Sequence, residues 1–197
     1  MELVGPGDAY PYFELADQVL SAIEEFLTGA PAPSLAERAL ATVLFTDVVE
    51  STSLARDIGD KRWRGLLDLH DEAVRSGIAS QSGQLVRFTG DGVLATFDGP
   101  GRAVRFSSAL QPELARIGLQ IRTGIHTGEI ELRDDEIGGL AVHLAARIMA
   151  IAGPGEILVS RTVKDLVIGS SMAFQDRGMH ALKGFEGDWQ IYSVITS

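Results

Sequence analysis

The chain of 197 residues has the length of one domain with a short appendage, and it can bury a core without crosslinks. It contains no cysteine, which excludes disulfides, thiolate metal sites and cysteine nucleophiles. Its 17 basic and 27 acidic residues give a net charge of −10, so we expect no nucleic-acid or membrane partner. It has no apolar run of the ~20 residues that a membrane span needs and no signal peptide, so we expect a cytoplasmic protein.

The first 35 residues differ in composition from the rest and are expected to form a leader. Apolar residues at three- and four-residue spacings predict a helix over residues 13–27. The segment 29–34, rich in proline and alanine, follows as a stiff linker. The main domain is expected to occupy residues 36–197.

Strand and helix patterns alternate along this main domain. Gly90-Asp91-Gly92 and Thr127-Gly128 are predicted to form the tips of two hairpins. The whole pattern is typical of an α+β fold with a mostly antiparallel sheet flanked by helices. The predicted elements are strand 42–49, helix 60–80, strands 84–89 and 93–97, helix 102–117, strands 119–126 and 129–133, helix 139–152, strand 156–160, helix 162–167 and strand 189–195.

Two isolated aspartates stand at the ends of predicted strands. Asp47 lies in the apolar run 43–49, where a carboxylate is costly unless a cation, a metal or backbone amides compensate its charge. Asp91 occupies a hairpin tip, where Asp-Gly is a common turn pair. Carboxylates at adjacent strand ends suit two-metal phosphoryl transfer. A salt-bridged or helix-capping Asp47 and a purely turn-forming Asp91 are the alternatives.

The turn that follows Asp47 is a candidate anion site. Residues 48–52 lead from a strand into a helix, and amides at a helix N-terminus bind anions. Ser51 as an ordinary N-cap explains the same residues. His126, in the second predicted hairpin, is expected to shape that hairpin rather than to take part in chemistry.

Further candidates for an anionic ligand are mostly cationic. His143 and Arg147 are four residues apart and therefore share one face of the predicted helix 139–152. Arg87 is predicted to project from its strand on the face opposite Val86 and Phe88, and a carboxylate partner is its simpler role. Lys183 precedes a glycine, as a solvated turn lysine also would.

In their order and spacing, these segments resemble the class III nucleotidyl cyclases, the catalytic domain of adenylyl and guanylyl cyclases. Histidine at position 143, where most members have asparagine, resembles an actinobacterial subfamily. The start of the leader is similar to the C-terminal end of an α/β-hydrolase domain. The cyclase resemblance covers about residues 38–195 and depends on the segments 45–52, 87–92, 124–128, 136–148 and 182–184.

The resemblance implies a ferredoxin-like βαββαβ palm and a head-to-tail homodimer with active sites at the interface. Asp47, Val48 and Asp91 of one chain would hold two Mg²⁺ or Mn²⁺ ions per site. The turn formed by Val48, Val49, Glu50, Ser51 and Thr52 would bind the β- and γ-phosphates. The ribose 3′-OH would attack the α-phosphate in line, and pyrophosphate would leave.

The other chain would supply the remaining contacts. Arg87 and Glu136 would bind the purine, His143 the ribose, Arg147 the α-phosphate and Lys183 the terminal phosphates. Adenylyl cyclases usually have Lys and Asp where this chain has Arg87 and Glu136. Because the charge signs are kept, and because Glu136 would repel a guanine carbonyl, we expect ATP as the substrate. A guanylyl cyclase and a non-catalytic nucleotide-binding module are the alternatives.

Overall fold

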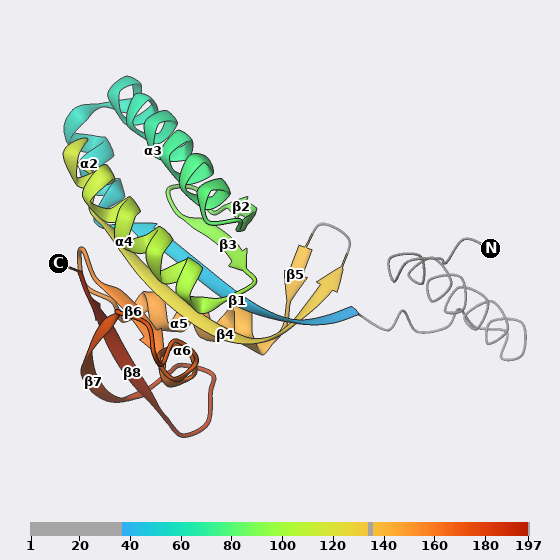
Figure 1. Ribbon diagram of the computed structural model, residues 1–197. Coiled ribbons are helices and arrows are strands. Elements are labelled where there is room, and N and C mark those ends of the chain that lie inside the picture. Colours follow the sequence, from blue (N-terminus) through green and yellow to red (C-terminus); the bar gives the residue numbers. More distant parts are fainter. Residues whose placement is uncertain (1–36, 134–135, 197) are drawn as a thin grey trace, which may run out of the picture. The chain divides into compact units, whose positions relative to one another are not determined.

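The computed structural model describes residues 37–133 and 136–196, apart from the side chain of Arg133 (Figure 1). The leader helix and linker predicted over residues 1–35 lie outside these ranges. In the described ranges, no helix has the length and apolar character that crossing a bilayer requires.

The described chain forms an α+β fold around one mixed sheet, as the sequence predicts. Its elements are β1 (Glu37–Val48), α2 (Ser51–Ile58), α3 (Asp60–Ser80), β2 (Gln84–Phe88), β3 (Val93–Phe97), α4 (Pro100–Arg116), β4 (Ile121–Arg133), β5 (Glu136–Gly138), α5 (Leu140–Ala150), β6 (Ile157–Ser160), α6 (Arg161–Leu166), β7 (Ala173–Ala181) and β8 (Asp188–Ile195).

The strands of the sheet follow the order β2-β3-β1-β4-β6-β8-β7, and β5 pairs with β4 outside this path. Its pairs are antiparallel except for β4 with β6. The segment from β1 to β4 runs strand, helices, two strands, helix, strand. With the order β2-β3-β1-β4, it forms the expected ferredoxin-like palm.

Helices cover both faces of the sheet, which explains why β1 is apolar on both sides. α3 and α4 lie together on one face, over a core that includes Leu44 and Phe106 (Figure 1). α5 packs on the other face, where Val43 and Ala145 are fully buried. Alternate residues of β1 therefore enter two different cores, as the pleat of a strand requires.

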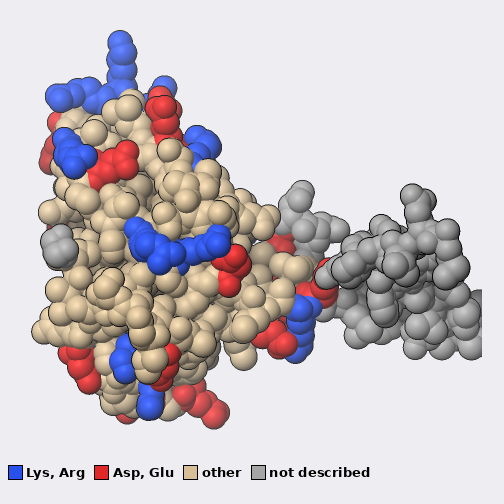
Figure 2. All heavy atoms as spheres, in the orientation of Figure 1, with Lys and Arg blue, Asp and Glu red and all other residues tan. Residues whose placement is uncertain are grey.

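The surface seen over α3 and α4 carries charges of both signs with uncharged surface between them (Figure 2). Ion pairs between residues four positions apart also occur in and next to these two helices. Arg75 Nη2 lies 3.7 Å from Asp71 Oδ2, and Arg102 Nε lies 3.3 Å from Asp98 Oδ1. The net charge of −10 therefore does not form one continuous acidic patch on this view of the protein.

The prediction of a hairpin at Thr127-Gly128 is wrong, because β4 runs without interruption through these residues. The glycines of this strand instead make room for α5. A Cβ at Gly124 would lie 2.2 Å from the backbone nitrogen of Met149, and a Cβ at Gly128 would lie 3.0 Å from Ala141 Cβ. Glycine here permits close helix-to-strand packing and does not mark a turn.

Strand β7 is absent from the sequence-based prediction. It lies at the edge of the sheet and pairs only with β8. Seven of its nine residues are exposed, so the strand lacks the apolar alternation by which half-buried strands are recognised.

We predict that Gly124→Ala destabilises the fold by about 3 kcal/mol. The new methyl group would clash with the backbone of α5, which cannot move aside by changing a rotamer as a side chain can. The measurement is the free energy of unfolding in urea. Gly65→Ala is the matched control, since Gly65 is an exposed residue within α3 and a Cβ there meets no atom within 4 Å. The control should stabilise by about 0.5–1 kcal/mol through helix propensity. Equal stability of the two variants would contradict the packing role of Gly124.

Candidate functional site

The end of β1 and the β2–β3 turn meet at one edge of the sheet. Thr46 pairs with Val93, and a Cβ at Gly92 would lie 2.2 Å from the carbonyl oxygen of Thr46. Asp47 follows Thr46 in the chain, and Asp91 precedes Gly92. The two aspartates that the sequence singles out therefore flank one backbone contact, as expected for carboxylates at adjacent strand ends.

Asp91 lies in a tight turn. The amide of Thr89 donates to the carbonyl oxygen of Gly92 at 2.9 Å, and Gly90 has a φ of 98°. This conformation favours glycine and matches the turn-forming role considered for this segment. The same turn holds Asp91 next to the end of β1, so the turn role and a role in a site are compatible.

The carboxylate of Asp47 is paired with Arg122, a residue that the sequence-based prediction missed. Asp47 lies directly opposite Arg122 in the antiparallel β1–β4 register. Nε of Arg122 donates to Oδ2 of Asp47 at 2.9 Å, and Nη2 donates to the same oxygen. The exposed fractions of the side chains are 35% for Arg122 and 28% for Asp47, so water still reaches the pair. The salt-bridged alternative for Asp47 thus describes its state in this structure.

The donors near Asp47 suit a hard divalent cation that takes other ligands from a substrate. The described ranges contain no group of three or more His, Asp or Glu side chains arranged for a metal. Asp47 and Asp91 would supply two carboxylates, and Val48, the last residue of β1, would add its backbone carbonyl. Mg²⁺ is commonly held by one or two carboxylates, with substrate phosphates and water completing its octahedron. The residues present fit such an ion.

The turn after β1 leads directly into α2. Glu50 is the N-cap residue in the left-handed region, with φ 54° and ψ 29°, and its side chain makes no capping hydrogen bond. Ser51 is the first helical residue, so its assignment as N-cap is wrong. The amide of Val49 is not available to an anion, because it donates to the carbonyl of Gln120 at 2.8 Å. The first amides of α2 are left without a side-chain cap and are suited to bind an anion.

The cations near α5 form a second group. His143 and Arg147 are both exposed, on the side of α5 opposite its buried residues. Lys183 is also exposed and follows the buried Leu182, which belongs to the same core cluster as Leu144. The turn is closed by a hydrogen bond of 3.0 Å from the amide of Phe185 to the carbonyl of Leu182. Lys183 is therefore anchored beside α5 through the residue that precedes it.

Strand β2 contains a bulge between Leu85 and Arg87. Arg87 pairs with Leu94, and Val86 packs in the core cluster that contains Leu94, so both side chains lie on one face. The prediction that Arg87 is opposite Val86 is wrong, whereas Phe88 does pack on the other face. Arg87 is exposed, and within the described ranges it forms no salt bridge, so the expected carboxylate partner is not found.

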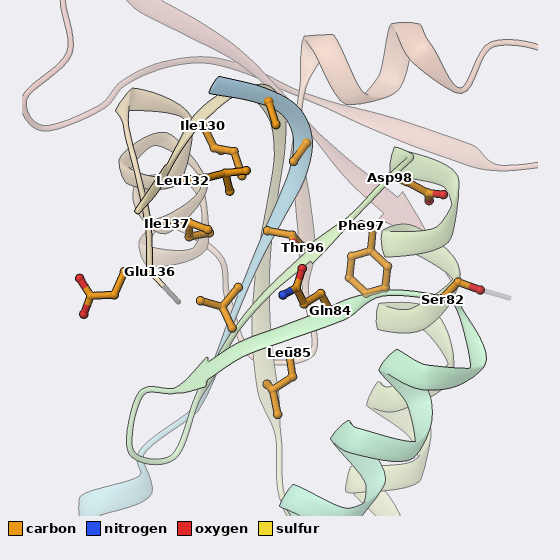
Figure 3. A pocket seen from close by; sticks show the side chains of 13 residues that line it. Ser82, Gln84, Leu85, Thr96, Phe97, Asp98, Ile130, Leu132, Glu136 and Ile137 are labelled. Atoms are coloured by element: carbon orange, nitrogen blue, oxygen red, sulfur yellow. The ribbon is translucent and has the colours of Figure 1, made fainter. Parts of the chain in front are cut away.

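A hollow of about 530 Å³ with both polar and apolar lining residues opens beside these strands (Figure 3). It is lined from β2 and β3 on one side and from the β4–β5 hairpin on the other. Val86, Ile130, Leu132 and Ile137, which pack in one core cluster, contribute apolar side chains to the wall. Glu136 lies at the rim and points away from the hollow (Figure 3). Glu136 is exposed and begins β5.

One chain thus presents the candidate residues in two groups. The first group lies at one edge of the sheet and consists of Asp47, Asp91 and the turn 48–52. The second group contains the other candidates, which are His143 and Arg147 of α5, Lys183, Arg87 and Glu136. Among the described residues, no hydrogen bond or ion pair connects the two groups.

His126 is a buried structural residue of β4. Its Nδ1 lies 2.8 Å from Ser160 Oγ, and its ring meets the Trp189 ring edge to face at 6.4 Å between centroids. Burial lowers the pKa of His126 from 6.5 to about 4. The expectation that His126 shapes a hairpin is wrong because the strand does not turn there, and the residue instead connects β4 with β6.

Comparison with known proteins finds relatives that match most of the chain. The family model of the adenylate and guanylate cyclase catalytic domain matches residues 36–196. A Rhizobium meliloti protein named "Putative adenylate cyclase 3" is 29% identical over 165 residues, which make up 79% of this chain. The chain spans only 28% of the length of that curated relative.

Two solved structures are also similar. The adenylyl cyclase CyaB of P. aeruginosa has a TM-score of 0.74 at 26% identity, and the match covers 82% of this chain and 96% of that one. An adenylate/guanylate cyclase/hydrolase from Silicibacter pomeroyi has a TM-score of 0.74 at 30% identity, covering 82% of this chain and 99% of that one.

We predict that His126 makes the fold less stable in acid. Because the folded pKa lies below the unfolded value of 6.5, the unfolded chain binds the proton more readily, and stability falls as the pH drops from 6.5 towards 4. The loss attributable to this residue is at most about 3 kcal/mol. Urea unfolding of wild type and His126→Gln across this pH range measures it. The variant should show a shallower pH dependence, and identical slopes would disprove the assignment.

Proposed function

Because the chain belongs to the adenylate and guanylate cyclase catalytic domain family, we propose that it is an adenylyl cyclase that converts ATP to 3′,5′-cyclic AMP and pyrophosphate. The observation that carries the proposal is the contact between Thr46 and Gly92, the chain neighbours of Asp47 and Asp91, together with the uncapped start of α2. Carboxylates for a metal and free amides for phosphates at one sheet edge suit phosphoryl transfer from a nucleotide.

Asp47, Asp91 and the carbonyl of Val48 would hold Mg²⁺ or Mn²⁺, two ions per active site. Bound there, the ions would favour deprotonation of the attacking hydroxyl and neutralise charge on the phosphates. The chain's own part is to fix the two carboxylates at adjacent strand ends. The amides of Ser51 and Thr52 would then orient the β- and γ-phosphates at the N-terminus of α2.

The separation of the two residue groups supports a site shared between two copies of the chain. His143 and Arg147 point away from the sheet that α5 covers, whereas Asp47 belongs to that sheet. In a head-to-tail homodimer, each chain would supply the metal group to one site and the α5 group to the other. The hollow beside Glu136, whose wall includes Ile130, Leu132 and Ile137, gives the second copy a concave surface to cover.

The α5 group would stabilise charge on the nucleotide. Arg147 is placed to donate to the α-phosphate, where charge grows in the transition state, and such donors make a large contribution to catalysis. Lys183 would bind the terminal phosphates, and His143 would donate to the ribose. The exposure of all three side chains in one chain is consistent with contacts completed only in the dimer.

Arg87 and Glu136 would select the base. A guanidinium can donate to the ring nitrogen of adenine, and a carboxylate can accept from its amino group. Guanine presents a carbonyl where adenine has the amino group, and a carboxylate repels it. Both side chains are exposed and therefore accessible to a base, and Glu136 lies at the rim of the hollow between β2 and β5.

We expect Mn²⁺-dependent formation of 3′,5′-cyclic AMP from ATP, with much slower turnover of GTP, measured by chromatography of the products. Asp47→Ala should lower the rate by about a thousandfold, because one metal carboxylate is lost. Asp68→Ala is the control, since Asp68 is an exposed residue of α3 away from both groups. An active Asp47→Ala protein would refute the metal assignment, and faster GTP turnover would reverse the base assignment.

A shared site makes a separate prediction about mixed chains. Asp47→Ala and Arg147→Ala proteins should each be inactive, yet their equimolar mixture should regain about a quarter of the wild-type rate. Half of the dimers would be hybrids, and each hybrid would have one intact site of two. The mixture is assayed after the chains are allowed to exchange. A mixture as inactive as its components, with exchange verified by mass labelling, would exclude sites shared in this way.

A further inference from the structure

The ion pair between Asp47 and Arg122 has no role in the proposed reaction, although it involves the carboxylate assigned to the metal. Both donated hydrogen bonds go to Oδ2 of Asp47. Strand pairing enforces the meeting, because the two residues are opposite each other in a register that continues through Val48 and Ile121. The two side chains can therefore separate only by changing their rotamers, while the strand register stays as it is.

We propose that Arg122 is the resident counter-ion of the metal carboxylate: it neutralises Asp47 in the metal-free protein and lowers the affinity of the site for a divalent ion alone. The inference rests on the proposed function, since it takes Asp47 as a metal ligand. Arg122 acts here through Asp47 and is a positioning residue.

The electrostatic argument does not depend on how the ion arrives. An ion that binds Oδ1 shares a carboxylate whose charge is already partly compensated, and an ion that takes both oxygens must displace the guanidinium. In each case a fixed positive charge lies within a few ångströms of the incoming cation and repels it. Water reaches the pair, which reduces the effect but does not remove it, because the two side chains are about a third exposed.

A nucleotide changes this balance. Its triphosphate brings negative charge to the same sheet edge, so the guanidinium no longer repels the complex as a whole. The site would therefore take its metal together with the nucleotide and bind the bare ion weakly. In the nucleotide-free protein, Arg122 compensates Asp47 and so prevents an uncompensated carboxylate at the end of an otherwise apolar strand.

The test is the affinity of the nucleotide-free protein for Mn²⁺ alone, measured by electron paramagnetic resonance of the free ion. Arg122→Gln should bind Mn²⁺ about five- to tenfold more tightly than wild type, because the repelling charge is gone. Arg122→Lys keeps the charge and should remain close to wild type. Arg122→Met keeps the aliphatic stem without the charge and repeats the test should the Gln variant unfold.

Arg38→Gln is the matched control. Arg38 lies on the same β1–β4 ladder, where its Nη1 is 3.1 Å from Glu129 Oε2, but it is nine positions along β1 from Asp47. The Arg38→Gln substitution removes the same charge about 30 Å from Asp47 and should leave the Mn²⁺ affinity unchanged. Unchanged or weaker binding by both Arg122→Gln and Arg122→Met overturns the counter-ion role. Wild-type binding by Asp47→Asn would instead overturn the metal site itself, so the two failures are distinguishable.

Discussion

The pairing of β1 with β4 over twelve consecutive positions is the constraint on which the rest of the molecule depends. It places Asp47 opposite Arg122 at one end of the ladder. It also presents Gly124 and Gly128 to α5, so that the helix can approach the strand closely enough to cover this face. β3 pairs on the other side of β1 and carries the Asp91 turn to the same edge.

Much of the palm could be predicted from apolar periodicity. The helix over residues 60–80 and the strand over residues 93–97 have the predicted bounds, because long amphipathic helices and short buried strands have clear patterns. β4 was split in two because glycine next to threonine is typical of a turn. Only the close approach of Gly128 to Ala141 of α5 reveals why this glycine is needed, and local sequence does not contain that contact.

Some residues of the candidate site could likewise be predicted from the sequence, and others could not. Asp47 was predicted from the cost of a carboxylate in an apolar strand, and Asp91 from its place at a hairpin tip. The structure brings both to one edge. Arg122 was missed, since it stands 75 positions from Asp47 and only the strand register connects them. The bulge that turns Arg87 to the face of Val86 was also invisible, because a bulge breaks the alternation from which faces are predicted.

A balance of charge explains how an acidic chain can serve a polyanionic substrate. The cations assigned to the nucleotide, such as Arg147 and Lys183, are exposed, and in the described ranges neither takes part in a salt bridge. Arg122, in contrast, is already paired with Asp47. In the proposed site, free cations for the phosphates and a compensated carboxylate for the metal belong to one arrangement, in which metal and nucleotide would each improve the site for the other.

The most direct test of the central claim is the position of the divalent ion. Mn²⁺ broadens the amide resonances of nearby residues, so titration of ¹⁵N-labelled protein locates the ion without any assay of turnover. The account predicts that broadening begins at residues 47–52 and 89–92. Broadening centred on other acidic residues, such as Glu129 and Glu131 at the far end of the β1–β4 ladder, would contradict it.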